Sequence, residues 1–213
     1  MKKFIIYACF ALFTVSSFSQ STKTIVLNPP DLNRGLPVMR ALTVRASEKD
    51  FDTAALKIQD LSDLLWAADG INRPESGKRT APSAQNAQDI DVYVSVKSGI
   101  YLYNAGKNLL EPVADGDYRK LIADKQENVA KAPAILLLVS DISRFRSGGD
   151  SLKLIWAAFD AGIVSQNISL FCASAGLATR PRASMDQQKL KEILKLKSTQ
   201  HLMLNNPVSC KKN

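Results

Sequence analysis

A polar turn at residues 79–88, with the sequence Arg-Thr-Ala-Pro-Ser-Ala-Gln-Asn-Ala-Gln, carries the side chains best suited to hold a ligand. The hydroxyl of Ser83 and the carboxamides of Asn86 and Gln88 come directly before an alternating apolar run from Ile90 to Val96. That alternation predicts a strand with one face in the core. Hydroxyl and amide groups cost free energy in such a place unless they are hydrogen-bonded. They therefore either cap the local backbone or bind a polar, planar ligand.

A second stretch with chemical potential is Gly-Asp-Ser-Leu at residues 149–152, which matches the serine-nucleophile block of one hydrolase family. A catalytic serine needs a base within hydrogen-bond reach. The only histidine is His201, and Ser198 and Thr199 stand where those hydrolases carry an aspartate. A helix start explains the block without catalysis, because Asp150 is a good N-cap residue. We favour the helix start and keep a serine esterase as the minor alternative.

Other site chemistries find little support in the residue pattern. One histidine and two cysteines after the first 19 residues offer no metal-ligand spacing, so no metal is expected. No glycine-rich dinucleotide or P-loop motif occurs. The lysines near the C-terminus are not interleaved with aromatic residues, which predicts a solvated helix face and no nucleic-acid partner. Cys172 and Cys210 could pair outside the cytoplasm, but a buried free thiol is favoured for Cys172.

The domain organisation follows from composition. The chain has 213 residues, 46% of them hydrophobic, which suits one domain with a sizeable core. Residues 1–19 combine two lysines, an apolar run and small residues before the cleavage point, which is typical of a secretory signal peptide. We therefore expect a secreted or periplasmic protein with no stable membrane insertion after cleavage. Residues 20–38 contain three prolines and predict an extended N-terminal segment, followed by one domain at 39–213.

The apolar periodicity predicts a mixture of helices and hairpin strands rather than a regular strand-helix-strand series. The expected helices run from residue 47 or 50 to 69, and over 117–130, 151–175 and 186–196. The expected strands cover 90–97, 100–103, 109–113, 134–139, 177–180 and 201–208. The run at 134–139 is apolar throughout and predicts a strand buried on both faces. Asp160, Gln166 and Asn167 interrupt the long helix. Neighbouring loops are expected to satisfy them, and contact with a ligand or a partner subunit is the minor alternative.

Four blocks along the chain together resemble one enzyme family. They are Leu-Leu-Trp-Ala-Ala-Asp-Gly-Ile-Asn-Arg at 64–73, the turn at 79–88, Asp-Ala-Gly-Ile-Val-Ser-Gln-Asn at 160–167 and Gly-Leu-Ala-Thr at 176–179. In this order they resemble the nitroreductase family of FMN-dependent oxidoreductases, and within it the SagB-type dehydrogenase branch. The resemblance spans about residue 39 to the C-terminus.

The resemblance implies an α+β nitroreductase-like fold. It has a central, mostly antiparallel sheet flanked by helices, and two copies form an intertwined homodimer with one FMN in each of two interface clefts. The implied activity is ping-pong hydride or electron transfer through flavin N5 with a small-molecule substrate, and no side chain needs to act as acid or base. An exported enzyme would need an electron donor other than the cytoplasmic nicotinamide cofactors.

The resemblance also implies the residues that contact the cofactor. Ser83, Asn86 and Gln88 match positions that hydrogen-bond the flavin ring and ribityl chain, for which amides and hydroxyls are suitable partners. Residues 181–184 match a segment whose backbone approaches N5, and three of these are the expected contacts: Pro181, Ala183 and Ser184. Thr43 and Arg45 match the block that binds the FMN phosphate, and Lys211 is expected to add a C-terminal phosphate contact.

Some positions depart from the family pattern. Ala41 and Leu42 stand where the phosphate block begins with two basic residues, and Ser209-Cys210 replaces a Gly-Tyr pair. Losing a charge-assisted phosphate contact weakens cofactor binding. The alternative is therefore a degenerate dimer of the same fold that no longer holds FMN and acts as a binding or structural protein.

Overall fold

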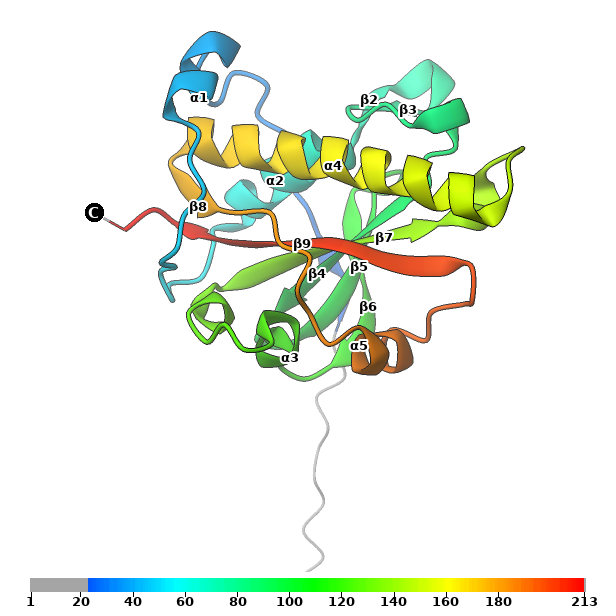
Figure 1. Ribbon diagram of the computed structural model, residues 1–213. Helices are drawn as coiled ribbons and strands as arrows, with labels where there is room; N and C mark the ends of the chain where they lie inside the picture. Colours follow the sequence, from blue (N-terminus) through cyan, green and yellow to red (C-terminus); the bar gives the residue numbers. More distant parts are fainter. Residues whose placement is uncertain (1–22, 213) are drawn as a thin grey trace, which may run out of the picture.

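The computed structural model describes residues 23–212, which form a sheet between two layers of helices (Figure 1). Seven strands lie in the order β1-β6-β5-β4-β7-β9-β8, and every pairing among them is antiparallel. Their bounds are Ile25–Val26 (β1), Ile90–Val96 (β4), Gly99–Asn104 (β5), Leu109–Asp115 (β6), Ala134–Asp141 (β7), Leu177–Thr179 (β8) and Gln200–Cys210 (β9). The expected mostly antiparallel α+β fold is confirmed.

Helices cover both faces of the sheet (Figure 1). One layer contains α1 (Val38–Val44), α2 (Ile58–Asp69) and α4 (Asp150–Ala175), and the other contains α3 (Arg119–Ala123) and α5 (Gln187–Ile193). A small hairpin of β2 (Ile71–Arg73) and β3 (Lys78–Arg79) stands apart from the sheet. Four single 3₁₀ turns complete the secondary structure: Pro74–Ser76, Ala84–Asn86, Val129–Lys131 and Ile142–Arg144.

Strand β7 is the centre of the core, and all eight of its residues are buried. Leu136 and Leu138 pack into the cluster formed with α2 and α4. Leu137 and Val139 point the opposite way, into the cluster formed with α3 and α5. The apolar run therefore correctly predicted a strand covered on both faces, because alternate side chains must each meet a helix layer.

Helix α4 has 26 residues and ends at Gly176, whose φ of 72° suits glycine. Its buried face, which includes Ala161, Val164 and Ile168, packs on the sheet and on α2. Among the described helices it alone is long and apolar enough to cross a bilayer, with 39% of the tested window buried. A central helix of a folded domain meets the same criteria, and α4 occupies that position here.

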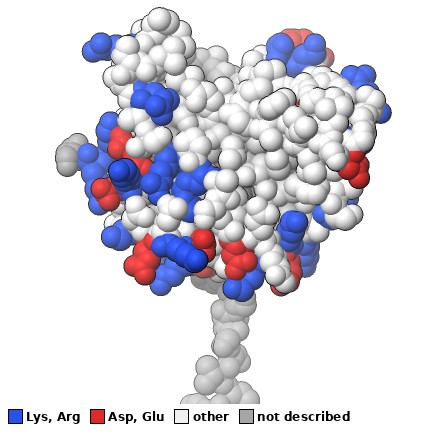
Figure 2. Space-filling view, in the orientation of Figure 1, with Lys and Arg blue, Asp and Glu red and all other residues white. Residues whose placement is uncertain are grey.

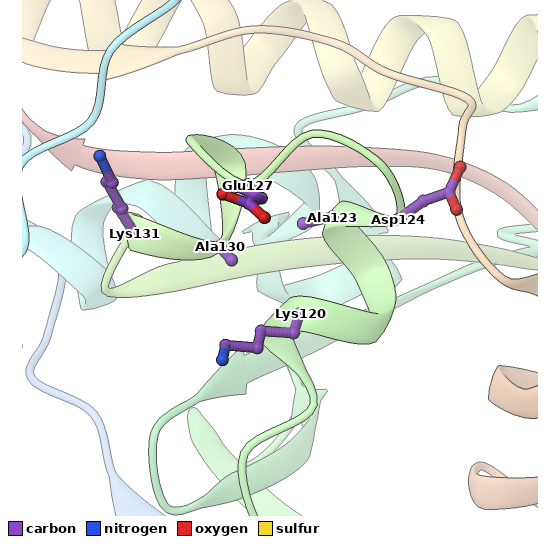
Figure 3. Close-up of a pocket in the computed structure, with 6 residues that line it drawn as sticks. All are labelled: Lys120, Ala123, Asp124, Glu127, Ala130 and Lys131. Carbon is purple, nitrogen blue, oxygen red and sulfur yellow. The ribbon is translucent and has the colours of Figure 1, made fainter.

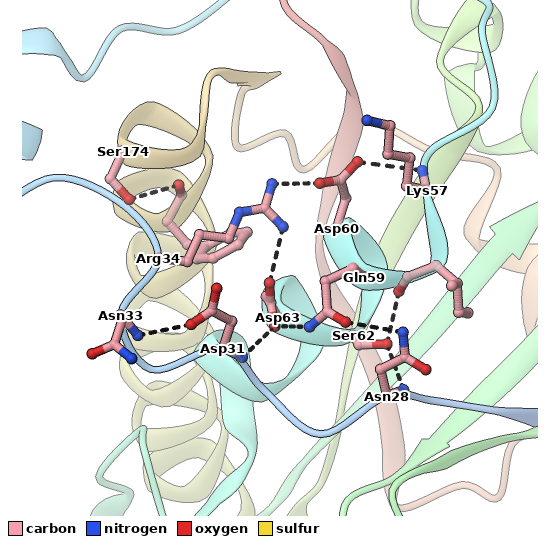
Figure 4. Close-up of polar contacts among 12 residues, drawn as sticks. Asn28, Asp31, Asn33, Arg34, Lys57, Gln59, Asp60, Ser62, Asp63 and Ser174 are labelled. Atoms are coloured by element: carbon pink, nitrogen blue, oxygen red, sulfur yellow. Dashed lines mark hydrogen bonds and ion pairs between the residues drawn. The ribbon is translucent and has the colours of Figure 1, made fainter.

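The N-terminal segment is held across α2 by polar contacts (Figure 4). The Asp31 backbone N–H and the Arg34 guanidinium each donate to Asp63 at 2.9 Å, and Arg34 also pairs with Asp60. Within the described part of this segment the structure has the short strand β1 and a turn near Asp31, and a short helix, α1, starts directly after Pro37. The sequence pattern did not predict α1, because only Ala41 of its residues is buried.

Two expected helices are shorter than predicted. The helix expected from residue 47 or 50 begins at Ile58, because Asp52 accepts the backbone N–H groups of Thr53 and Ala54 in a local turn. The helix expected over 117–130 ends at Ala123, where Asp124 takes a positive φ of 53°. The first difference arises from a side chain to backbone contact and the second from a backbone turn, and apolar periodicity reports neither.

Cys172 is a buried free thiol, as favoured from the sequence, and Cys210 is also unpaired among the described residues. Burial raises the pKa of the Cys172 thiol well above its usual range, so it stays protonated. The predicted signal peptide at 1–19 lies outside the described residues.

Candidate functional site

The turn that precedes β4 is a strained polar loop. Its backbone takes positive φ at Gln85, Asn86 and Gln88, with values of 56°, 53° and 47°. Side chains other than glycine adopt this region at a cost of about 1–3 kcal/mol each. The loop is held by the Ser83 hydroxyl, which accepts the Gln88 N–H at 2.8 Å, and by Asp160 of α4, whose two oxygens accept the Ala84 N–H at 3.1 and 2.9 Å.

The three predicted contact residues of this turn differ in how many of their side-chain hydrogen-bonding groups lack a partner. The Gln88 amide accepts from Arg79 Nε at 3.2 Å and donates to the Gly77 carbonyl at 3.1 Å. Asn86 is exposed, and its side chain makes no hydrogen bond to any residue from 23 to 212. The Ser83 hydroxyl keeps its own proton as a donor. The turn thus caps its own backbone and also presents one free amide and one hydroxyl.

Buried carboxyl groups lie behind the turn. Asp69 pairs with Arg79 at 2.6 Å, and its burial raises its pKa to about 7 despite the nearby guanidinium. Asp89 is fully buried and accepts from the Ser140 hydroxyl. Burial, together with the facing carboxyl of Asp160, raises the pKa of Asp89 to about 7, against the opposing hydrogen bond from Ser140. Two carboxyl groups on this side of the turn, those of Asp69 and Asp89, are therefore only partly ionised near neutral pH.

A second group of predicted residues lies near the C-terminal end of α4. The Thr43 hydroxyl donates to the Arg40 carbonyl at 2.8 Å, and half-buried Arg45 ends α1 without an ion pair to any described residue. The Lys211 ammonium pairs with Glu48 at 3.2 Å, and its backbone N–H reaches Gly176. A cleft of about 420 Å³ opens here, lined by residues 47–50, Ala178, Lys211 and Lys212.

The segment at 181–184 presents a backbone edge to solvent. Pro181, Ala183 and Ser184 are exposed, whereas Arg182 points inward and donates to Asn205 at 2.7 Å and to the Ala123 carbonyl at 3.0 Å. The backbone of Arg182 exchanges two hydrogen bonds with Asn205, at 2.9 and 2.7 Å. The N–H groups of Ala183 and Ser184 have no partner in the described part of the chain, so they can donate to a ligand.

A cleft of about 440 Å³ adjoins this segment between α3 and the following turn (Figure 3). The Ser184 hydroxyl donates to Asp124 on its rim at 3.0 Å. The cleft is lined by ammonium, carboxylate and methyl groups, which belong to Lys120, Ala123, Asp124, Glu127, Ala130 and Lys131. The cleft therefore offers opposite charges beside the backbone edge, and a small polar molecule would fit it.

The turn and the group at Lys211 do not meet within one chain. The turn is hydrogen-bonded to Asp160 of α4, whereas the Lys211 backbone N–H donates to the Gly176 carbonyl at the end of the same helix. The separation along the helix is 176 − 160 = 16 residues, or about 24 Å at roughly 1.5 Å per residue. In Figure 1 the β2–β3 hairpin and the end of α1 likewise lie above different parts of α4.

The esterase alternative is not supported by the geometry. Ser151 is exposed in the first turn of α4, and no hydrogen bond joins it to His201 among residues 23–212. Gly149 is the N-cap and Asp150 the first helical residue, one position later than the capping role expected for Asp150. The described residues also contain no cluster of metal ligands, while the absence of a metal stays a prediction.

Sequence reasoning missed several residues that build the site. The favoured expectation for Asp160, a hydrogen bond from a neighbouring loop, is confirmed, and that loop is the polar turn itself. Arg182 was matched only as part of the backbone segment 181–184, and Glu48 was not singled out, because a charged side chain in an irregular segment gives no periodic signal. The signal that could have identified Asp160 is a lone carboxylate on the apolar face of a long helix, which requires a fixed hydrogen-bond donor.

The predicted contact positions thus contribute a polar turn with a free amide, an exposed backbone edge and a cleft lined by three lysines and two acidic residues, called here the basic cleft. Residues 42–208 match the model of the nitroreductase family, so the chain belongs to that family and is a nitroreductase-family oxidoreductase. Members of this family typically use a flavin. The matched range contains every predicted contact residue except Lys211.

Known relatives agree with this assignment. A protein of Methanocaldococcus jannaschii named as a nitroreductase is 27% identical over 190 residues, which are 85% of this chain and 95% of the relative. A crystal structure named as a nitroreductase from Ralstonia eutropha is 34% identical, with a TM-score of 0.84 over 91% of this chain and 92% of the other. The Escherichia coli microcin synthetase complex contains a chain of the same fold, with 19% identity, a TM-score of 0.68 and coverage of 98% and 85%.

Proposed function

We propose that this protein is an FMN-dependent oxidoreductase that works as a homodimer outside the cytoplasm and belongs to the SagB-type branch of its family. The observation that carries the proposal is the set of unused hydrogen-bond donors at the predicted contact positions. They are the Asn86 amide, the Ser83 hydroxyl and the N–H groups of Ala183 and Ser184. A flavin presents several acceptors and one donor along a single edge, which suits this set.

The chain would hold the two ends of the cofactor with different chemistry. Ser83, Asn86 and Gln88 would bind the flavin ring and ribityl chain, although the Gln88 amide already has two partners. Lys211 would hold the phosphate at the basic cleft, together with Thr43 and Arg45 from the adjoining end of α1, and Glu48 would compete with the ligand for Lys211. When bound, FMN supplies the redox chemistry, and the protein supplies position and electrostatics.

The backbone edge at 181–184 would stabilise negative charge on a reduced ligand. The N–H groups of Ala183 and Ser184 are fixed because the neighbouring Arg182 is anchored to Asn205 through both backbone and side chain. Preorganised donors of this kind stabilise developing charge without a reorganisation cost. The adjoining cleft at Asp124 is where a small polar substrate would bind.

A second copy of the chain is needed to complete this site. The free face of α4 carries Ile155 and Phe159, which are 50% and 63% exposed, and α1 exposes Val38, Met39 and Leu42. Figure 2 shows that the surface over α4 is almost without charged side chains, while Lys and Arg lie mainly around its edges. Exposed apolar patches of this kind mark interfaces. Pairing through α4 would place the turn of one copy beside the basic cleft of its partner.

We also propose that residues 1–19 are a signal peptide and that the mature chain begins at Gln20. Intact-mass analysis of the exported protein from its host checks this directly. An N-terminus at Gln20 supports export, whereas an intact Met1 in a cytoplasmic fraction contradicts it.

The cofactor proposal is tested by titrating the mature chain with FMN and following flavin fluorescence. We expect saturable binding, and we expect Asn86→Ala or Arg45→Ala to weaken it about tenfold or more through loss of a hydrogen bond to a polar or charged group. Asn33→Ala and Lys195→Ala are matched controls, because both residues are exposed and lie outside the site. A folded protein that binds no FMN would instead favour the degenerate dimer.

A further inference from the structure

Arg182 is a buried cation whose hydrogen-bond partners are all neutral. It is 7% exposed, and its guanidinium donates to the Asn205 side chain at 2.7 Å and to the Ala123 and Ile122 carbonyls at 3.0 and 3.4 Å. Its Nε has no partner among residues 23–212. A guanidinium does not lose its proton in proteins, and a buried charge is normally paired with an opposite one. Arg182 therefore brings into the interior a positive charge that forms no ion pair with a described residue.

The charged groups near Arg182 do not neutralise it. In the part of the chain that the structure describes, Arg180 and Asp124 are the two that act on it, and their charges have opposite signs. The Asp124 carboxylate is exposed and accepts the Ser184 hydroxyl at 3.0 Å, whereas half-buried Arg180 donates to the neutral Gln126 amide. Water screens the exposed carboxylate more than it screens the guanidiniums. Three further charged residues line the cleft beyond Asp124, and their charges sum to one positive charge: Lys120, Lys131 and Glu127.

Arg182 immediately precedes two free backbone donors in the chain. The N–H groups of Ala183 and Ser184 accept no partner from residues 23–212, and both residues are exposed. The edge is held in place because the Arg182 backbone exchanges two hydrogen bonds with Asn205, at 2.9 and 2.7 Å, and the Asn205 amide donates to the Ser184 carbonyl at 3.1 Å. Fixed N–H donors next to an uncompensated cation favour negative charge at the same place.

We propose that Arg182 makes the backbone edge at 181–184 an anion site, and that the edge therefore favours the reduced form of bound FMN over the oxidised form. The proposal rests on the proposed function for the identity of the ligand, whereas the preference of the edge for an anion does not. A hydride brings two electrons and one proton, so its transfer adds one negative charge to the flavin ring. Arg182 is a positioning residue, because it acts on the ligand through its charge and through the N–H groups that follow it.

The first test uses the protein without FMN, so it does not depend on the proposed function. Formate is titrated into the wild type, Arg182→Lys and Arg182→Gln, and the Ala183 and Ser184 amide resonances are followed by ¹⁵N–¹H NMR. Both variants lose the planar fork of the guanidinium, but only the lysine keeps the charge. We expect saturable shifts in the wild type and in Arg182→Lys, and binding at least about fivefold weaker in Arg182→Gln. Formamide, which is neutral and of the same size, should cause no saturable shift. No response to formate in the wild type, or an equal response in Arg182→Gln, overturns the proposal.

The second test measures the reduction potential of bound FMN in the same variants, by reduction with dithionite against a reference dye. We expect the ratio of reduced to oxidised affinity to fall about tenfold in Arg182→Gln, which is about 30 mV for a two-electron couple. Arg182→Lys should change the ratio by less than about threefold, because it keeps the charge. Lys125→Met is the control, since it removes an exposed cation next to Asp124 and should leave the ratio unchanged.

The outcomes of the second test separate charge from structure. A potential that is unchanged in Arg182→Gln, or that falls equally in Arg182→Gln and Arg182→Lys, shows a merely structural role and contradicts the proposal. If no variant and not the wild type binds FMN, the cofactor assignment alone is refuted, and the response to formate decides whether Arg182 creates an anion site.

Discussion

Arg79 shows how single residues build the polar turn. Its guanidinium pairs with Asp69 at 2.6 Å and reaches the Gln88 amide at 3.2 Å, so one cation connects α2, β3 and the turn. The carboxyl groups around it stay partly protonated because burial outweighs that single charge. The ionisation of these carboxyl groups therefore depends on desolvation, which raises their pKa values, and on a few hydrogen bonds, which lower them.

This balance predicts how stability depends on pH. The pKa values of Asp69 and Asp89 are about 7 in the folded chain, against 3.8 ordinarily. The folded state therefore binds more protons than the unfolded state between these values, and the free energy of unfolding falls as the pH rises from about 4 to about 7. Urea unfolding at a series of pH values across this range measures the change in the free energy of unfolding.

The control for this prediction is His201. Burial lowers its pKa, which contributes in the opposite sense just below its ordinary value of 6.5. His201→Gln should therefore steepen the fall in stability with pH, and Asp69→Asn should flatten it. A stability that rises steadily from pH 4 to 7 in His201→Gln would contradict the account.

At the scale of elements, the N-terminal segment is held by one cation, Arg34, which pairs with two carboxylates of α2. The Asp63 side chain is 2% exposed and pairs with Arg34, which also lies over the Phe171 ring at 5.6 Å. Arg34→Met leaves that carboxylate buried without a cation, at a cost of about 3–5 kcal/mol. Chemical denaturation measures the loss, and Arg40→Met on exposed α1 should change stability by less than about 0.5 kcal/mol. Equal losses in both variants would show that the ion pair is not the cause.

How well the sequence predicts each element depends on the force that shapes it. The strand at 134–141 and the helix at 150–175 were predicted closely, because burial leaves an apolar signature. Helix α1 was missed because its apolar residues face outward, toward the proposed partner copy. The chemistry of Ser83 and Asn86 marked them as candidate ligand contacts and the resemblance related them to a flavin, but their link to Asp160 required coordinates, since 76 residues separate Ala84 from that carboxylate.

At the scale of the whole molecule, the exposed face of α4 predicts the oligomeric state. Phe159→Glu places a charge in the middle of the proposed interface, where it would be desolvated without a partner. We expect the wild type to be a dimer and Phe159→Glu a monomer by sedimentation at micromolar concentration. Ser151→Glu, exposed on the first turn of the same helix, is the matched control and should stay dimeric. A monomeric wild type would contradict the proposed composite site, which is formed between two copies of the chain.

The most direct test of the composite site is a mixed dimer. Asn86→Ala damages the turn and Arg45→Ala damages the phosphate end, and these lie far apart in one chain. If each FMN lies between two copies, a dimer with one chain of each variant contains one intact site and one doubly damaged site. Flavin absorbance of the purified mixed dimer should then show about one FMN per dimer. If the mixed dimer retains no more FMN than either parent variant does, both halves of the site lie in the same chain, and this result would contradict the account.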